Sequence, residues 1–190
     1  MKARPIRKKT DNTNLAHKVG FRIEMLRRFE TQAVSVLDLY AGTNKIWDAV
    51  GKHVQVSRYY GVDIVDKKGK NITADNAKII PSLDLSAFNV IDIDAYGTPI
   101  KPLFLLYENK TLQKGTIVFC TEIHSGLSKL PIGFFTEFKL KPLYKKSEVL
   151  FNKKAGEFCF GMLGNRGVSR VWAYGEHGGS NEKNYFCFAV

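Results

Sequence analysis

Cysteine is scarce in this sequence: three cysteines occur among 190 residues, at positions 120, 159 and 187. An odd number of widely spaced cysteines fits neither a disulfide framework nor a C-x-x-C zinc site. Each one follows a phenylalanine inside an apolar stretch. We therefore expect buried, free thiols in a protein of the reducing cytoplasm.

Long hydrophobic runs are also missing, since no apolar stretch approaches the ~18–20 residues that cross a bilayer. The first nine residues are basic but precede no apolar segment of the secretory type. With 44% hydrophobic residues and 25% charged residues, the chain has the composition of an ordered, soluble protein. The length predicts one domain at residues 13–190, preceded by a flexible basic arm at residues 1–12.

Acidic residues are outnumbered, with 18 Asp and Glu against 29 Lys and Arg, which gives a formal net charge of +11. Residues 1–30 and 139–154 contribute this excess. Concentrated positive charge binds polyphosphates, so a nucleic acid, either RNA or DNA, is the expected partner, and no membrane is expected. The alternative is a solvated basic surface without a ligand. The candidate phosphate contacts are Lys8, Lys9, Arg22, Lys145 and Lys146.

Hydrophobic periodicity predicts an α/β fold. Apolar residues at helical spacing predict a helix over residues 15–29, with Lys18, Arg22 and Arg28 on its other faces. Short apolar runs predict parallel strands at residues 34–39, 58–64, 72–76, 88–94 and 116–120. Helical segments are expected at residues 46–50 and from Pro102 onward.

Two further strands are predicted at residues 168–174 and 184–190. The connection between them is too short for a crossover helix, so they must be antiparallel. The expected fold is therefore a doubly wound, mostly parallel seven-stranded sheet with an antiparallel C-terminal hairpin and helices on both faces.

Polar residues follow the predicted strands at the edge where such sheets bind ligands. Asp38 precedes a loop in which Gly42 allows close approach of the backbone and Asn44 tolerates a positive φ. Asp63 is placed to bind ribose hydroxyls, and Asp75 with Asn76 to bind an adenine edge. Each acid could instead be a helix cap or a turn residue.

The phosphate-binding pattern G-x-G-x-x-G is absent, so a ligand with ribose and adenine but no phosphate fits better. Residues 36–44 resemble the first motif of class I S-adenosylmethionine-dependent methyltransferases. The resemblance implies S-adenosyl-L-methionine as cofactor and a Rossmann-like methyltransferase domain. The residues implied to bind the cofactor are Asp38, Tyr40, Gly42, Asn44, Asp63, Ile64, Asp75, Asn76 and Asp92.

Residues 92–99 read Asp-Ile-Asp-Ala-Tyr-Gly-Thr-Pro. Two acids in an apolar strand are costly to desolvate unless they face a site. The run resembles the D-x-D-P-F-G-S-P motif of tRNA guanine-N2 dimethyltransferases and, more loosely, the D-P-P-Y motif of amino-methylating DNA enzymes. The resemblance implies that Asp94 binds an exocyclic amine and that Tyr96 stacks on the base. Gly97, Thr98 and Pro99 would line the substrate site.

Three residues depart from the family's motifs: Ala95 stands where the family has proline, and Tyr40 and Asn44 replace glycines. The resemblance nevertheless implies an enzyme that methylates an exocyclic amine of a nucleic-acid base, with RNA favoured over DNA. One alternative is a non-catalytic nucleic-acid-binding protein with a degenerate methyltransferase fold. Another is a methyltransferase acting on protein or a small molecule.

Other chemistries have little support in the sequence. A cytosine-C5 mechanism needs a cysteine nucleophile after a proline, and phenylalanine precedes every cysteine here. The four histidines are far apart and match no triad or metal-ligand spacing.

Overall fold

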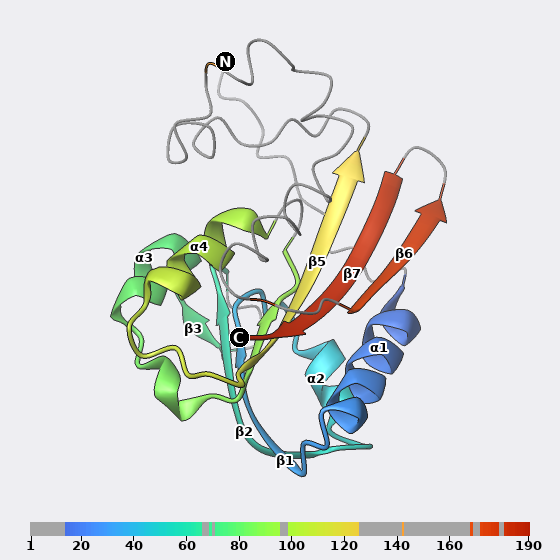
Figure 1. Ribbon diagram of the computed structural model, residues 1–190, viewed down its shortest axis with the longest axis horizontal. Helices are drawn as coiled ribbons and strands as arrows, with labels where there is room; N and C mark the ends of the chain where they lie inside the picture. The colour runs from blue at the N-terminus through green and yellow to red at the C-terminus, as the bar shows by residue number, and fades with distance from the viewer. Residues whose placement is uncertain are drawn as a thin grey trace.

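The computed structural model describes residues 14–65, 69, 71–95, 99–125, 142, 168, 172–178 and 181–190 (Figure 1). In chain order the elements are α1 (Leu15–Arg28), β1 (Ala33–Asp38), α2 (Lys45–Val50), β2 (Gln55–Asp63), β3 (Ile72–Thr73), α3 (Asn76–Ile79), the 3-10 turns η1 (Ile80–Ser82) and η2 (Leu85–Ala87), β4 (Val90–Ile93), α4 (Ile100–Glu108), β5 (Ile117–Ser125), β6 (Trp172–Gly178) and β7 (Asn181–Ala189).

The strands form one sheet in the order β3-β2-β1-β4-β5-β7-β6. The first five strands in this order run parallel to one another, and β7 pairs antiparallel with both β5 and β6. Six strands have at least four residues, whereas β3 is a two-residue strand at the outer edge of β2. The predicted mostly parallel sheet with an antiparallel C-terminal hairpin is confirmed. The strand order reverses between β1 and β4, which defines the switch point of a doubly wound fold.

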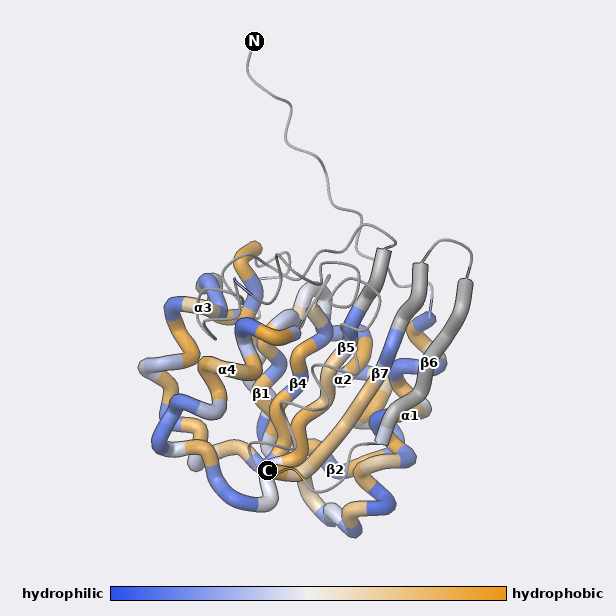
Figure 2. Tube along the Cα trace, turned by 45° about the horizontal axis from the view of Figure 1, so that its top comes forward, coloured by the Kyte–Doolittle hydropathy of each residue, from blue (hydrophilic) through white to orange (hydrophobic). Residues whose placement is uncertain are grey.

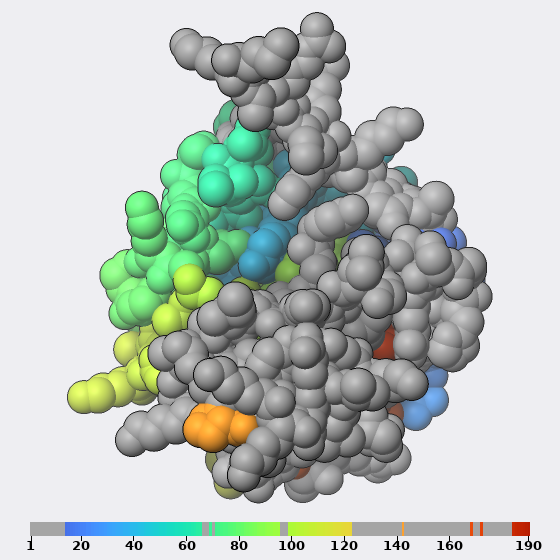
Figure 3. All heavy atoms as spheres, turned by 90° about the horizontal axis from the view of Figure 1, so that it is seen from above, coloured from blue at the N-terminus to red at the C-terminus, as the bar shows by residue number. Residues whose placement is uncertain are grey.

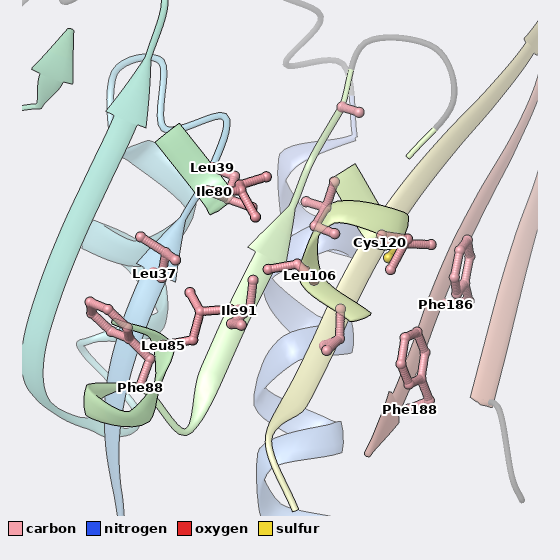
Figure 4. Close-up of a cluster of buried hydrophobic side chains, with 14 of the residues drawn as sticks. Leu37, Leu39, Ile80, Leu85, Phe88, Ile91, Leu106, Cys120, Phe186 and Phe188 are labelled. Carbon is pink, nitrogen blue, oxygen red and sulfur yellow. The ribbon is translucent and has the colours of Figure 1, made fainter. Parts of the chain in front are cut away.

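Two apolar cores cover the two faces of the sheet. On one face, α4 and the segment between β3 and β4 pack on the central strands through residues such as Leu37, Ile80 and Leu106 (Figure 4). On the other, α1 and α2 contribute Leu26 and Trp47. All four residues of β4 are buried. Figure 2 shows the hydrophobic central strands between more polar helices. Burial on both faces explains why the central strands have continuous apolar sequences.

Helix α1 buries two charged residues that hydrophobic periodicity places away from its apolar face. Lys18 and Arg22 are buried together with Met25 and Leu26, and the helix does not present these two cations to solvent. Aromatic contacts add to this packing, including the edge-to-face pair of Phe29 with Trp172. The expectation that Lys18 and Arg22 lie on exposed faces is therefore wrong.

Several boundaries also differ from prediction. Strand β2 begins at Gln55, three residues earlier than expected, and β5 continues to Ser125. Helix α4 begins at Ile100, before Pro102. The predicted third strand shortens to β3 because Asp75 caps α3. The hairpin strands extend into the glycine-rich connection, since β6 runs to Gly178.

Cys120 and Cys187 are buried and free, as predicted, whereas Cys159 lies outside the described residues. In the described part of the chain, no helix has the length and apolar character required to cross a membrane.

Candidate cofactor and substrate site

The strand-end acids gather at one edge of the sheet. Asp38 at the end of β1 is the register partner of Asp92 in β4, and Asp63 ends β2. Asp94 follows β4 directly, and its charge acts on Asp38 together with that of Asp92. Figure 3 looks down on this edge. In a doubly wound sheet ligands bind here, outside the carboxyl ends of the strands that flank the switch point.

The loop after β1 is held in a left-handed conformation. Gly42 has φ 54° and Asn44 has φ 63°, which confirms the positive φ predicted at Asn44. The Gly42 N–H donates to Asp63 Oδ2 at 2.9 Å, and Asn71 Nδ2 donates to the Gly42 carbonyl at 3.2 Å. Asn44 is the residue before α2. The loop is therefore tied to the end of β2 on one side and continues into a helix on the other.

Gly61 makes room for this arrangement. A Cβ atom at this position would overlap Asn71 Oδ1 and would lie 2.8 Å from Ala41 Cβ. No side chain fits in that space without displacing Asn71, which contacts the Gly42 carbonyl. The signal in the sequence is a glycine inside a strand, which indicates a close approach of another chain segment.

Both carboxylate oxygens of Asp63 accept hydrogen bonds from backbone N–H groups. Besides the contact with Gly42, its Oδ1 accepts from the Val65 N–H at 3.0 Å. A carboxylate oxygen has the capacity to accept two hydrogen bonds, so a ribose hydroxyl can still bind to Asp63. Beside it, Ile64 is 70% exposed. An exposed isoleucine beside the Asp63 carboxylate would suit the apolar face of a purine whose ribose is bound by Asp63.

Asp38 is a buried carboxyl that no cation of the described residues contacts directly. Its Oδ1 accepts from the Tyr40 N–H at 3.1 Å and its Oδ2 from the Tyr59 hydroxyl at 3.0 Å. Burial, followed by repulsion from Asp92, raises the pKa of Asp38 well above its usual value. A positively charged ligand beside Asp38 would favour its ionised form.

The Asp92 carboxylate is hydrogen-bonded to other side chains inside the protein core. Its Oδ2 accepts from Arg22 Nε and from Trp47 Nε1, both at 2.7 Å, and its Oδ1 accepts from Arg22 Nη2 at 2.7 Å. Neither Asp92 nor Arg22 is more than 1% exposed. The predictions that Asp92 binds a cofactor and that Arg22 binds a phosphate are therefore wrong. The two side chains neutralise each other in the core.

Asp94 has one satisfied and one unsatisfied oxygen. Lys18 Nζ lies 2.6 Å from Oδ2, in an ion pair whose side chains are 11% and 13% exposed. Oδ1 is buried and accepts no hydrogen bond from the residues that the structure describes. A buried acceptor without a donor is costly, and such a group in a native structure calls for a ligand or another explanation.

Asp75 and Asn76 make different contacts. The Asp75 side chain is exposed and caps α3 by accepting from the Ala77 N–H at 2.9 Å. Asn76 donates through Nδ2 to the Leu39 carbonyl and leaves Oδ1 buried without a partner. The local hydrogen bond of Asp75 is therefore that of a helix cap, which is the alternative stated for this residue above. Tyr40 lies near this pair, since Asn76 and the charge of Asp75 act on its hydroxyl, whose pKa is raised mainly by burial.

Within the described part of the chain, three buried acceptors at this edge thus have no donor: Oδ1 of Asn44, Asn76 and Asp94. They follow β1, β3 and β4 respectively. A ligand that fits them must present hydrogen-bond donors, and the ammonium group and the adenine amine of S-adenosyl-L-methionine are such donors. The residues present therefore fit S-adenosyl-L-methionine.

Of the residues predicted to contact the substrate, the structure describes Asp94, Arg22 and Pro99. Pro99 is buried and precedes α4, where its carbonyl accepts from the Leu103 N–H. Tyr96, Gly97, Thr98, Lys8, Lys9, Lys145 and Lys146 lie outside the described residues. A cavity of 440 Å³ lies between residues 81–84 and 108–111, on the segments before β4 and after α4. It includes none of the strand-end acids. The described residues contain no cluster of His, Cys, Asp or Glu that could hold a metal ion.

Four contributors were not predicted for this site: Lys18, Trp47, Tyr59 and Asn71. Each contacts a predicted residue and none ends a strand. The position of Trp47 in a short amphipathic helix gives no sign that its indole N–H binds an acid. Lys18 and Arg22 do carry a signal, because they stand four residues apart and match two acids at strand spacing.

Comparison with solved structures finds the same fold at low sequence identity. A SAM-dependent methyltransferase from Archaeoglobus fulgidus matches with a TM-score of 0.50 and 11% identity, over 90% of this chain and 94% of that chain. A provisionally assigned S-adenosyl-L-methionine-dependent methyltransferase from Methanococcus maripaludis matches with a TM-score of 0.52 and 15% identity, over 93% and 87%.

A provisionally assigned hemolysin from Streptococcus thermophilus also matches, with a TM-score of 0.53 and 13% identity, over 91% of this chain and 65% of that chain. No protein-family model and no curated protein matches the sequence. The comparisons show that the chain has the α/β fold of SAM-dependent methyltransferases. Since one fold hosts several functions, the chemistry must be argued from the site.

Proposed function

We propose that the protein transfers a methyl group from S-adenosyl-L-methionine to an exocyclic amine of a nucleic-acid base, with RNA as the preferred substrate. One observation carries the proposal. At the switch point of a methyltransferase-type sheet, the Gly42 loop is bound to Asp63, and Asp94 leaves a buried oxygen without a donor.

The cofactor would lie along the loop after β1. Asp63 is placed for the ribose hydroxyls, Ile64 and Asn76 for the adenine, and Asn44 for the ammonium group. The unpartnered Asn44 and Asn76 oxygens support this assignment because each requires a donor. The bound cofactor supplies an electrophilic methyl group.

The substrate amine would bind at Asp94. The lone pair of an exocyclic amine is delocalised into its ring, so catalysis requires alignment and an acceptor for the amine N–H. Asp94 Oδ1 is such an acceptor. The assignment of Tyr96 as the stacking residue rests on the resemblance of residues 92–99 to the guanine-N2 motif, as do the contacts of Gly97 and Thr98. Because a stacked base is out of reach, the base would be turned out of its helix.

The basic segments would bind phosphates through Lys8, Lys9, Lys145 and Lys146. Arg22 is no longer part of this group because it is buried against Asp92. Such contacts make binding strongly dependent on salt concentration.

Labelled cofactor offered with RNA, DNA and protein pools tests the proposal. We expect label in RNA, and we expect Asp94→Asn to lower the rate of transfer by about a hundredfold because the amine is no longer oriented. Asp84→Asn is the matched control, since Asp84 is an exposed cap of the turn η2. Transfer that survives Asp94→Asn unchanged would remove Asp94 from the site.

A non-catalytic nucleic-acid-binding protein is the second candidate. The saturated Asp92 and the departures at Ala95, Tyr40 and Asn44 favour it. It predicts RNA binding that weakens with salt and does not respond to S-adenosyl-L-methionine. Label in any pool excludes it.

A further inference from the structure

Helix α1 faces β4 through two ion pairs in register. Lys18 and Arg22 are four residues apart, which separates them by about 6 Å along a helix. Asp92 and Asp94 are two residues apart, which separates them by about 6.6 Å along a strand. The match places Lys18 on Asp94 at 2.6 Å and Arg22 on Asp92 at 2.7 Å.

The two pairs have different environments. In the inner pair, Arg22 with Asp92, the carboxylate accepts three hydrogen bonds. The remaining guanidinium nitrogen of Arg22, Nη1, donates to the Lys18 carbonyl at 3.0 Å, so the hydrogen-bonding groups of this buried pair are satisfied. Among the described residues, the outer pair is joined by one contact, its side chains are partly exposed, and Asp94 Oδ1 accepts no hydrogen bond. The inner pair stabilises the packing of α1. The outer pair lies where the substrate amine is proposed to bind.

We propose that Lys18 is a positioning residue for methyl transfer: its ammonium group holds Oδ2 of Asp94, so that Oδ1 faces the amine. This inference rests on the proposed function and adds a residue that no strand-end motif contains. Lys18 is a point charge with a flexible stem, and at this position it engages a single oxygen. The other oxygen stays available as an acceptor.

The charges around the pair give Lys18 a second effect. Asp38, Asp92 and Asp94 lie close enough to repel one another, and Lys18 and Arg22 are the cations that offset them among the described residues. Without Lys18, one cation would face three carboxyl groups. The side chain of Asp94 would then turn towards solvent, where its oxygens are hydrated, and the acceptor would leave the site.

The test measures steady-state kinetics of Lys18→Met and Lys18→Gln with labelled cofactor and RNA. We expect kcat to fall by about tenfold or more in Lys18→Met, since small misplacements at the reacting centre have effects of this size. KM for RNA and cofactor affinity by calorimetry should change less than about threefold. Lys18→Gln, which keeps a side-chain N–H donor, should fall between this variant and the wild type.

Arg28→Met is the matched control. Arg28 lies on the same helix and pairs with Glu24 on its exposed side. Its loss should leave kcat unchanged. Urea unfolding of each variant establishes that it is folded at the assay temperature, and Lys18→Gln replaces Lys18→Met in the comparison if the methionine variant unfolds.

A double-mutant cycle with Asp94→Asn tests whether Lys18 acts through Asp94. We expect Lys18→Met to cost less than about threefold in the Asp94→Asn background, because coupled residues are not additive. Unchanged kcat in both single Lys18 variants, or multiplicative losses in the cycle, would overturn the role of Lys18 and leave the proposed function intact. A wild-type protein that transfers no methyl group would overturn both.

Discussion

At the scale of single residues, the most unusual group is the buried guanidinium of Arg22. Its side chain is stacked near the Phe119 ring, at 5.5 Å from the ring centre, and is fully paired with Asp92. Burial by itself lowers the pKa of Arg22, but the attraction of Asp92 outweighs this effect and keeps the pKa raised. The charge therefore persists at any pH at which the protein is folded.

Arg22→Met should destabilise the protein by about 3–5 kcal/mol, because it leaves the Asp92 carboxylate buried without a counter-charge. Urea unfolding followed by circular dichroism measures the loss. Arg28→Met removes an exposed ion pair of the same helix and should cost less than about 1 kcal/mol. Equal losses in the two variants would contradict the structural role assigned to the Arg22 pair.

Asp38 gives a prediction for pH dependence. Since burial and then Asp92 raise its pKa above the usual 3.8, protonation of Asp38 stabilises the folded state. This contribution is complete below pH 3.8 and is lost as the pH rises through the raised pKa. Asp38→Asn mimics the protonated form, so the stability of the variant relative to wild type should increase from about pH 5 to about pH 8.

Urea unfolding of both proteins at the two pH values measures this difference. Asp84→Asn is the control that should not respond over this interval, because hydrogen bonds from Ser86 lower the pKa of Asp84 and its carboxylate is therefore ionised in both the folded and the unfolded state. A relative stability of Asp38→Asn that falls over the same pH interval would contradict the raised pKa.

The residues of the site were predictable where a general rule places them. Strand-end acids and the loop conformation at Gly42 and Asn44 follow from the sheet topology and from backbone preferences. Lys18 and Arg22 were misplaced because hydrophobic periodicity assigns charged residues to solvent, whereas here carboxylates compensate their burial. A local pattern does not show which acid from a distant strand will face a helix.

At the scale of elements, the loop between β1 and α2 depends on Gly61 in β2. Gly61→Ala should destabilise the fold and weaken cofactor binding, because a Cβ atom at Gly61 collides with Asn71, which binds the Gly42 carbonyl. Thermal unfolding and calorimetry measure the two effects.

Gly20→Ala is the matched control for this change. Gly20 lies in α1, and apart from its chain neighbours and the helix's own backbone no atom lies within 4 Å of the position that a Cβ atom would take there. Alanine at this position should therefore stabilise the helix by about 0.5–1 kcal/mol. A Gly61→Ala variant as stable as Gly20→Ala would contradict the close packing at Asn71.

Element types were predicted more reliably than element ends. The apolar sequences of β1 and β4 reflect burial on both faces, and this signal survives in the sequence. The ends depend on tertiary contacts. Strand β2 starts at Gln55 because it pairs with Ala33 of β1, a partner that local sequence does not reveal.

At the scale of the whole molecule, the proposed function depends on one edge of one sheet. Asp38, Asp63 and Asp94 reach this edge from three strands, and α1 closes it on one side through Lys18. The fold follows from topology and packing. The function follows only if this edge binds the cofactor.

Calorimetric titration with S-adenosyl-L-methionine tests that point directly. We expect one saturable site with a Kd of about 1–100 μM, weakened about tenfold or more by Asp63→Asn and unchanged by Gly20→Ala. A folded wild-type protein that gives no binding heat at millimolar cofactor would contradict cofactor binding at this edge.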